Sequence, residues 1–317
     1  MPTPANDTMP TFDRLLVATD FSVASQAACR TAIDTCLALR ASLVILHVFR
    51  PVEDTAQQTG GQKQEAEKKA LQDKCRAALE ELRSEAVQAG VECEVILGTG
   101  NPTATILATI AARKIDLTIM GTSALHGLER IVFDSTTEAV LRKAPCPVLT
   151  VGPHASNSEK ALQSVGPVLF ATDFHFTTIH AIRFAASFSQ LTASPLHCLH
   201  VMPRTLEACI QCQVVPAIMS EALQQLANES GVVVETPICA TTYGSEVSCA
   251  VVDYARQHNA KLIVLGVRKA SLEASETHLH IAYRIITEAP CPVLTMAFAS
   301  QPDDAIETVR RKAAALV

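Results

Sequence analysis

The chain has 317 residues, of which 48% are hydrophobic and 18% charged, so it can form two domains that each bury a core. Its formal net charge of −6 offers no basic surface to nucleic acid or to an anionic membrane. No apolar run reaches the ~18 residues of a membrane-spanning helix, and the first ten residues do not resemble a signal peptide. We expect a cytoplasmic protein whose cysteines are mostly buried thiols.

The first half of the chain alternates short apolar runs with helical patterns. The apolar runs predict strands at 14–18, 43–49, 91–97, 116–120 and 147–151. Helices are expected between them, with Ser22 and Asn101 as N-caps of the first and third and a long charged helix at 63–89. Fully apolar strands that alternate with helices predict a parallel sheet with helices on both faces.

The second half repeats this order. Ala-Thr-Asp-Phe at 18–21 returns at 171–174, Leu-His-Val at 46–48 returns at 199–201, and Ala-Pro-Cys-Pro-Val-Leu-Thr at 144–150 returns at 289–295. Units of this length are whole domains rather than solenoid repeats, so the chain is a tandem duplication. The boundaries that we expect are a disordered N-terminus at 1–10, domains at 11–152 and 167–298, a linker at 153–166 and a tail at 299–317.

Three loops of each copy meet at the carboxyl edge of its predicted sheet, where open α/β sheets bind their ligands. In the first copy they follow the strand that ends at Ala18, the strand that ends near Val48 and the strand that ends near Gly121. A glycine followed by a helix that begins at Ser135 could present backbone N–H groups to a phosphate.

Each copy resembles a universal stress protein domain over nearly its full length. The resemblance rests on Ala-Thr-Asp-Phe-Ser, Leu-His-Val, Met-Gly-Thr-Ser and the segment from Ser-Thr-Thr-Glu to Cys-Pro-Val-Leu-Thr-Val at 135–151. It implies two tandem, doubly wound domains, each with a five-stranded parallel sheet of the Rossmann-like, adenine nucleotide alpha hydrolase-like type. Family members pair through their last strands, so 147–151 and 292–296 could pair within one chain as a pseudo-dimer, and a homodimer is also open.

The resemblance further implies an adenine nucleotide, ATP or AMP, with Mg²⁺ as a possible companion. In the family, the first-strand aspartate and the backbone at the start of the second strand hold adenine and ribose, and a glycine loop holds the phosphates. The residues that inherit these roles in the first copy are Ala18, Thr19, Asp20, Leu43, Gly121, Ala124, Ser135 and Thr136. Those in the second copy are Ala171, Thr172, Asp173 and Gly266.

The phosphate loop departs from the family pattern of Gly, two residues, Gly, nine residues, Gly and Ser or Thr. The first copy has Ala124 and Asp134 at the second and third glycines. A Cβ crowds a phosphate there, and a carboxylate ~4 Å from it costs about 4 kcal/mol at an effective dielectric near 20. The second copy keeps Gly266 and replaces the others by Lys269, Leu279 and His280. We therefore expect binding mainly in the first copy, of AMP, adenosine or a cyclic nucleotide rather than of tightly held ATP.

Structural roles remain open for several of these residues. Asp20 and Asp173 could cap the helical turn that follows them, and Gly121 and Gly266 could serve tight turns. His47 and His200 lie on apolar strands and are expected to be satisfied core histidines rather than catalysts.

Cys209 and Cys212 form an isolated C-x-x-C. Cys198 and His200 on the adjoining strand could complete a Cys₃His set for zinc. A redox role would need a strand and a helix of the thioredoxin type around the motif, which the Val-Val-Pro that follows disfavours. We expect incidental loop cysteines first, a redox-sensitive pair second, and no metal.

No G-x-S-x-G, H-E-x-x-H or complete P-loop is present, so we expect no enzyme, although weak ATP hydrolysis stays open. Two functions are left. One is a stress protein that senses an adenine nucleotide, which the retained Asp20 and Ser135 favour. The other is a scaffold that binds no nucleotide and acts through dimerisation and partner contacts, which Asp134 favours.

Overall fold

The computed structural model describes residues 10–50, 61–122, 135–155, 165–173, 181–204, 221, 237–268 and 276–298. The first repeat contains β1 (Arg14–Thr19), α1 (Val23–Leu39), β2 (Ser42–Phe49), α2 (Gly61–Gln88), β3 (Cys93–Thr99), α3 (Pro102–Arg113), β4 (Leu117–Gly121), α4 (Ser135–Lys143) and β5 (Val148–Val151). The second contains β6 (Val168–Ala171), α6 (Ile182–Leu191), β7 (Leu196–Pro203), β8 (Ile238–Gly244), α8 (Val247–Gln257), β9 (Leu262–Arg268), α10 (Glu276–Glu288) and β10 (Val293–Phe298).

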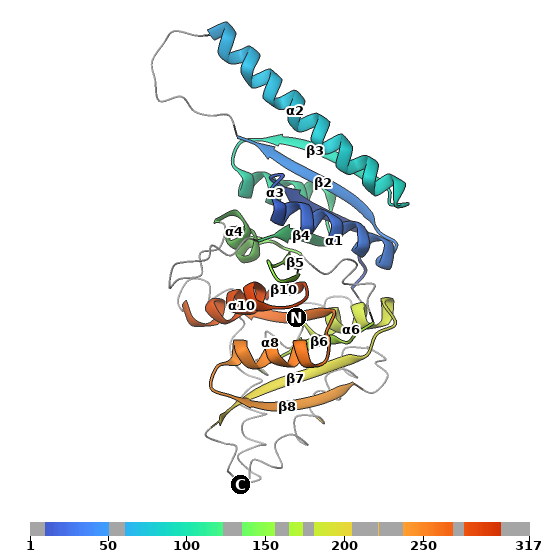
Figure 1. The fold of residues 1–317 in the computed structure, drawn as a ribbon, viewed down its shortest axis with the longest axis vertical. Coiled ribbons are helices and arrows are strands. Elements are labelled where there is room, and N and C mark those ends of the chain that lie inside the picture. Colours follow the sequence, from blue (N-terminus) through green and yellow to red (C-terminus); the bar gives the residue numbers. More distant parts are fainter. Residues whose placement is uncertain are drawn as a thin grey trace, which may run out of the picture.

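All ten strands form one sheet in the order β3-β2-β1-β4-β5-β10-β9-β6-β7-β8 (Figure 1). Within each repeat the strand order is third, second, first, fourth, fifth, and every neighbouring pair is parallel. This is the doubly wound α/β arrangement that the alternation of apolar runs and helices predicts. The order reverses beside the first strand of each repeat, so the switch points lie between β1 and β4 and between β6 and β9.

Helices cover both faces of the sheet. One apolar layer packs α1, α2 and α6 against the sheet through residues such as Ala28, Leu79 and Phe188. The opposite layer packs α3, α4, α8 and α10 through residues such as Ile110 and Val252. Alternate residues of a strand face opposite layers, which is why the central strands are largely apolar on both sides.

The expected N-caps of α1 and α3 are confirmed. The Ser22 side chain accepts a hydrogen bond from the backbone N–H of Ser25, and that of Asn101 accepts one from Ala104. Pro102 follows Asn101 at the first turn, where its missing N–H removes no helical hydrogen bond. These caps place the starts of both helices at the carboxyl edge of the sheet, directly after β1 and β3.

The two repeats join through their last strands, as the resemblance implies. β5 and β10 pair antiparallel, with Leu149 opposite Leu294. Thr150 Oγ1 donates to the Val293 carbonyl at 3.0 Å, and Thr295 Oγ1 donates to the Val148 carbonyl at 3.2 Å. This pairing covers the two edges that separate repeats would expose and leaves β3 and β8 as the outer strands.

The N-terminal segment makes a second connection between the repeats. The ring centroids of Phe12 and Phe188 lie 4.8 Å apart, and Phe12 is buried. Ser187 Oγ on α6 donates to the Pro10 carbonyl at 2.8 Å. Because β5 and β10 are antiparallel while each repeat is parallel inside, the carboxyl ends of the two repeats lie at opposite edges of the sheet.

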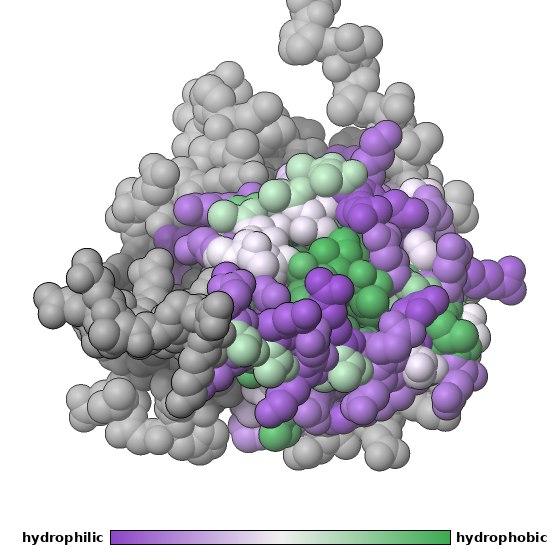
Figure 2. Space-filling view, turned by 90° about the horizontal axis from the view of Figure 1, so that it is seen from above, coloured by the Kyte–Doolittle hydropathy of each residue, from purple (hydrophilic) through white to green (hydrophobic). Residues whose placement is uncertain are grey.

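The outer helix α2 lies beside β2 and β3 at one end of the molecule (Figure 1). Its inner side contributes the buried Leu79 and Ala86 to the core, whereas most of its other residues are exposed. Seen from this end, hydrophilic side chains border an apolar patch near the centre of the coloured surface (Figure 2). Of the helices that the structure describes, none combines the length and hydropathy that crossing a bilayer requires.

The shared core predicts that the two repeats unfold together. Leu149 is 0% exposed at the seam, so Leu149→Ala should lower the unfolding free energy by about 2–5 kcal/mol. All three tyrosines, Tyr243, Tyr254 and Tyr283, belong to the second repeat and there is no tryptophan, so tyrosine fluorescence reports that repeat alone. In denaturant, fluorescence and far-UV circular dichroism should give coincident transitions that Leu149→Ala shifts equally. Two separate transitions, with fluorescence unmoved, would contradict this.

Candidate functional site

A cavity of about 480 Å³ lies at the carboxyl edge of the first repeat, at the switch point between β1 and β4. Its walls come from the ends of β1, β2 and β4 and from the starts of α1, α3 and α4, with one side of α2. The expected residues that line it are Ala18, Thr19, Asp20, Gly121 and Thr136. Residues from three separate parts of the chain are therefore brought together at one site.

Asp20 begins the tight connection from β1 to α1. Its Oδ1 accepts a hydrogen bond from the backbone N–H of Ser22 at 3.0 Å. Asp20 therefore supports the turn that follows it, which is the structural role left open for it above. Burial raises the pKa of the carboxyl group, but hydrogen bonds with the Ser22 and Ser25 side chains and with the Ser22 backbone outweigh it, and the pKa lies below its ordinary value. Asp20 is exposed at the cavity and is ionised at neutral pH.

The turn itself holds an unusual conformation. Phe21 has φ of 64°, in the left-handed region that a bulky side chain rarely adopts. Its backbone N–H donates to Thr19 Oγ1 at 3.0 Å, which holds the turn in place. The Phe21 ring packs on His47 with a centroid distance of 4.4 Å, so the turn is also fixed to the neighbouring strand β2.

The two histidines of the Leu-His-Val motif make the same contact in both repeats. His47 Nδ1 lies 2.8 Å from the Thr19 carbonyl, and His200 Nδ1 lies 2.8 Å from the Thr172 carbonyl. A carbonyl can only accept, so Nδ1 carries the proton in each ring. Burial lowers the pKa of His200, against the opposing effects of the Thr172 carbonyl and the Asp173 charge. Both rings are half-buried and line cavities, so they are satisfied as expected but are not enclosed in the core.

Gly121 is required by packing. A Cβ at this position would lie 2.2 Å from the Ala24 carbonyl oxygen and 2.8 Å from the Ser25 nitrogen, both backbone atoms of α1. Thr137 Oγ1 donates to the Gly121 carbonyl at 3.4 Å from the start of α4. The glycine thus allows β4 to end directly against α1, at the wall of the cavity.

The expectation for Leu43 is wrong. Leu43 pairs with Leu15 near the amino end of β2, whereas Thr19 pairs with His47 at the carboxyl end. Four residues of strand separate the two positions, about 13 Å, so Leu43 lies in the core away from the cavity. Backbone of β2 reaches the cavity instead through its carboxyl end, at His47 and Val48.

Several cavity residues did not emerge from the sequence. Arg50 directly follows β2 and brings a guanidinium group to the rim, and Thr137 adds a second hydroxyl beside Thr136. Leu71 and Cys75 come from α2. The sequence could have indicated Arg50, because it is a cation directly after a predicted strand, at the edge of the sheet where ligands bind.

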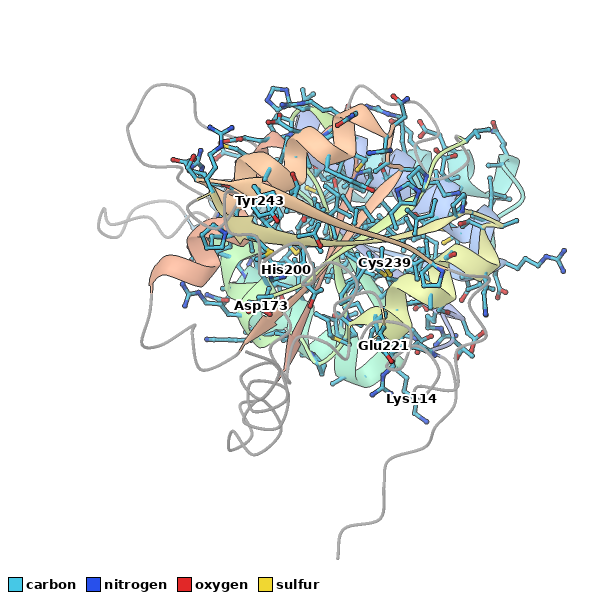
Figure 3. All side chains as sticks on the ribbon, turned by 90° about the horizontal axis from the view of Figure 1, so that it is seen from below. Lys114, Asp173, His200, Glu221, Cys239 and Tyr243 are labelled. Atoms are coloured by element: carbon cyan, nitrogen blue, oxygen red, sulfur yellow. The ribbon has the colours of Figure 1, made fainter. Side chains whose placement is uncertain are left out.

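The second repeat has a cavity of about 230 Å³ at the corresponding edge. The expected residues that line it are Ala171, Thr172, Asp173 and Gly266. Asp173 and His200 lie beside each other there (Figure 3). In place of the two threonines at the start of α4, α10 presents Ile281 and Ala282, so this cavity is smaller and lacks their hydroxyl groups.

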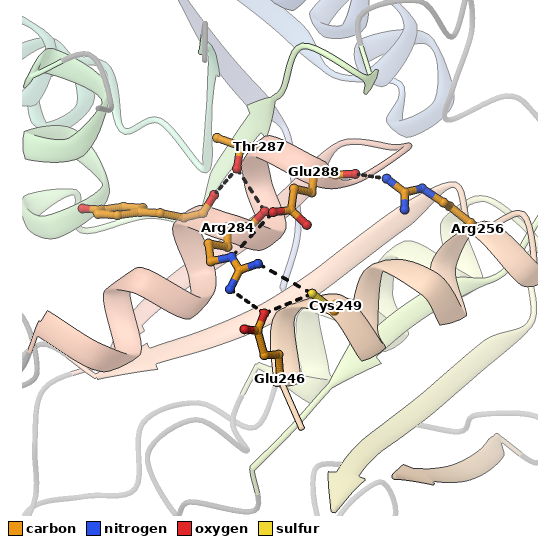
Figure 4. Close-up of polar contacts among 7 residues, drawn as sticks. Glu246, Cys249, Arg256, Arg284, Thr287 and Glu288 are labelled. Atoms are coloured by element: carbon orange, nitrogen blue, oxygen red, sulfur yellow. Dashed lines mark hydrogen bonds and ion pairs between the residues drawn. The ribbon is translucent and has the colours of Figure 1, made fainter. Parts of the chain in front are cut away.

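An ion pair ties together the two helices that wall this second cavity. Arg284 Nη1 on α10 lies 2.6 Å from Glu246 Oε2, directly before α8 (Figure 4). The thiol of Cys249 donates to the same carboxylate at 3.2 Å, and this hydrogen bond raises the pKa of Cys249, as does burial. Glu246 occupies the place of the N-cap Asn101 but makes no capping hydrogen bond, so its carboxylate serves the helix contact instead.

The phosphate-loop positions are described only in part. Ser135 begins α4, and Leu279 and His280 lie in α10. The loop positions Ala124, Asp134 and Lys269 lie outside the described residues. So do Cys209 and Cys212 of the C-x-x-C. Within the described parts of the chain, no three His, Cys, Asp or Glu side chains gather as a metal site would require. The expectation of mostly buried cysteines does not hold for Cys75 and Cys249, which are half-buried.

Sequence comparison agrees with the repeated site. The sequence model of the universal stress protein family matches residues 11–152 and 165–296. The chain belongs to the universal stress protein family. A universal stress protein of Thermus aquaticus is 34% identical over 142 residues, covering 44% of this chain and 98% of its own length. The universal stress protein YxiE of Bacillus subtilis is 28% identical over 151 residues, covering 44% of this chain and 99% of its own length. Each relative thus spans one repeat of this universal stress protein.

A solved structure shares the whole fold. The universal stress protein from Archaeoglobus fulgidus DSM 4304 aligns with a TM-score of 0.69 and 20% identity, covering 90% of this chain and 98% of its own. At this identity the likeness concerns the fold alone. It extends across both repeats, because no single repeat could cover so much of the chain.

The position of Gly121 predicts a stability defect that is independent of any ligand. Gly121→Ala forces a Cβ against the α1 backbone, so the unfolding free energy should fall by about 1–3 kcal/mol or more in denaturant titrations. Thr136→Ala, on the neighbouring cavity wall, is the control and should cost much less. Unchanged stability of Gly121→Ala would refute the packing role.

Proposed function

We propose that this universal stress protein binds one adenine nucleotide per chain, of the ATP or AMP type, in the cavity of the first repeat, as part of a cytoplasmic stress response. The observation that carries the proposal is the meeting of an ionised Asp20, a helix start at α4 and the cation Arg50 around one cavity. Its volume of about 480 Å³ falls in the range of small-molecule and cofactor sites.

The nucleoside end of the ligand would meet Asp20 and the end of β2. A carboxylate accepts hydrogen bonds, so Asp20 suits the exocyclic amino group of adenine or the ribose hydroxyls. Apolar side chains of Leu71, Ile106 and Met120 line the same cavity and offer surface to a flat base. Val48, which lines the cavity, would contact it rather than Leu43.

The phosphate end would meet α4. The first backbone N–H groups of a helix have no partner within the helix, and they carry the positive end of its dipole. Thr136 adds a hydroxyl group beside them, and Arg50 adds a positive charge at the rim. Mg²⁺ would accompany ATP as the phosphate counterion.

The described residues of the second repeat offer a poorer place for a phosphate. Its cavity has less than half the volume, and Ile281 and Ala282 stand where the first repeat has threonines. Burying a phosphate against apolar side chains carries a high desolvation cost. We therefore assign a single nucleotide to each chain.

Calorimetric titration of the nucleotide-stripped protein with ATP–Mg²⁺, AMP and cyclic AMP tests the proposal. Asp20→Asn keeps an oxygen for the Ser22 N–H but removes the charge, so affinity should fall about tenfold or more while the turn persists. Asp173→Asn is the matched control and should bind like the wild type. Absence of heat with every nucleotide would favour the scaffold without nucleotide, and equal losses in both variants would refute the assignment to the first repeat.

The lowered pKa of Asp20 predicts how binding depends on pH. The carboxylate stays ionised as pH falls from 7 to 5, and its contribution is lost only as pH falls through the lowered pKa. Adenosine is the appropriate probe because it has no phosphate to titrate. Its affinity should be constant from pH 7 to 5, and an affinity that halves or more over this range would show that another group governs binding.

A further inference from the structure

Two cysteines of the second repeat lie side by side on β7 and on the outer strand β8. Cys198 on β7 and Cys239 on β8 are direct register partners in a parallel pair. Neighbouring strands lie about 4.8 Å apart, which falls within the Cα separations of roughly 4.4–6.8 Å that disulfides span. Both side chains belong to the same apolar layer, so they leave the sheet on the same face.

The two thiols interact in the reduced protein. The neighbouring Cys239 side chain raises the pKa of Cys198, as does burial. The thiol of Cys239 also lies 3.8 Å from the Pro237 carbonyl. Because the two residues are register partners whose side chains leave the same face of the sheet, no change of strand pairing is needed to bring the sulfur atoms together.

Access to the pair is asymmetric. Cys198 is 0% exposed, whereas Cys239 is half-buried on β8, the last strand of the sheet. In Figure 3, Cys239 is set apart from Asp173 and His200 at the cavity. A small oxidant can reach Cys239 first, and Cys198 is placed to react second.

We propose that Cys198 and Cys239 form a reversible disulfide when the protein meets a low-molecular-weight disulfide such as oxidised glutathione. The proposal is independent of nucleotide binding in the first repeat. It assigns the redox-sensitive pair to the sheet rather than to the C-x-x-C of Cys209 and Cys212.

The reaction takes two exchange steps. The Cys239 sulfur attacks one sulfur of oxidised glutathione, whose S–S bond breaks, and the first glutathione leaves as a thiolate that takes up the Cys239 proton. The Cys198 sulfur then attacks the Cys239 sulfur and displaces the second glutathione, which takes up the Cys198 proton. Two protein thiols are oxidised, and one glutathione disulfide is reduced to two thiols.

The disulfide would tie the outer strand β8 to β7. It would close a loop of about 40 residues, a length for which a crosslink removes substantial entropy from the unfolded chain. The oxidised protein should therefore melt several degrees higher than the reduced protein. Because Leu199 follows Cys198 and lines the second cavity, the crosslink also stiffens one wall of that cavity.

The test uses the full chain, equilibrated with oxidised glutathione and quenched in acid with an alkylating agent. Peptide mapping without reduction should find Cys198 linked to Cys239, and reductant should restore both thiols. In Cys198→Ala, Cys239 should instead accumulate a stable mixed disulfide with glutathione, because no second thiol displaces it. Cys249→Ser removes a half-buried thiol elsewhere in the repeat and should leave the crosslink unchanged.

Two results would overturn the proposal. In the first, wild-type Cys239 keeps its glutathione while Cys198 stays reduced. In the second, Cys239 pairs with another cysteine, such as Cys209 or Cys212. Melting curves provide a second readout, since the rise on oxidation should vanish in Cys198→Ala and in Cys239→Ser, with circular dichroism of the reduced variants as the check on folding.

Discussion

The antiparallel pairing of β5 with β10 is the constraint on which the rest of the structure depends. It converts two five-stranded sheets into one, and Leu149 and Leu294 lie buried at its centre. It also directs the carboxyl edges of the repeats to opposite sides of the sheet, so the two cavities are separated by the full length of the strands. The shared sheet and core connect the two cavities.

The two repeats share the same arrangement of strands and helices and differ in the side chains that line their cavities. Both retain the aspartate after the first strand. Both also retain the histidine on the second strand, which donates to the carbonyl of the threonine directly before that aspartate. They differ on the helix after the fourth strand, where Thr136 and Thr137 correspond to Ile281 and Ala282. Substitution on one helix face thus changes the chemistry of a cavity without altering the fold, because the sheet that positions the cavity is untouched.

The turn after β1 shows how a single segment serves both folding and the site. Asp20 accepts from Ser22, Phe21 adopts a left-handed conformation, and Ser22 caps α1. The same turn leaves the Asp20 carboxylate exposed at the cavity. Among the described strands, β3 and β8 are the outermost, and the cysteine pair that we assign to a disulfide joins β8 to its neighbour β7.

The sequence by itself determined the duplication, the alternating α/β pattern, the caps at Ser22 and Asn101, and the cavity residues at the ends of β1 and β4, because strand ends and helix starts are local features. Only the tertiary structure decided what depends on register and on distant neighbours. It excluded Leu43, since an apolar run looks alike at both ends until pairing orients it. It explained Gly121 through an α1 backbone far away in the chain, and it joined Cys198 to Cys239, whose contact no local pattern encodes.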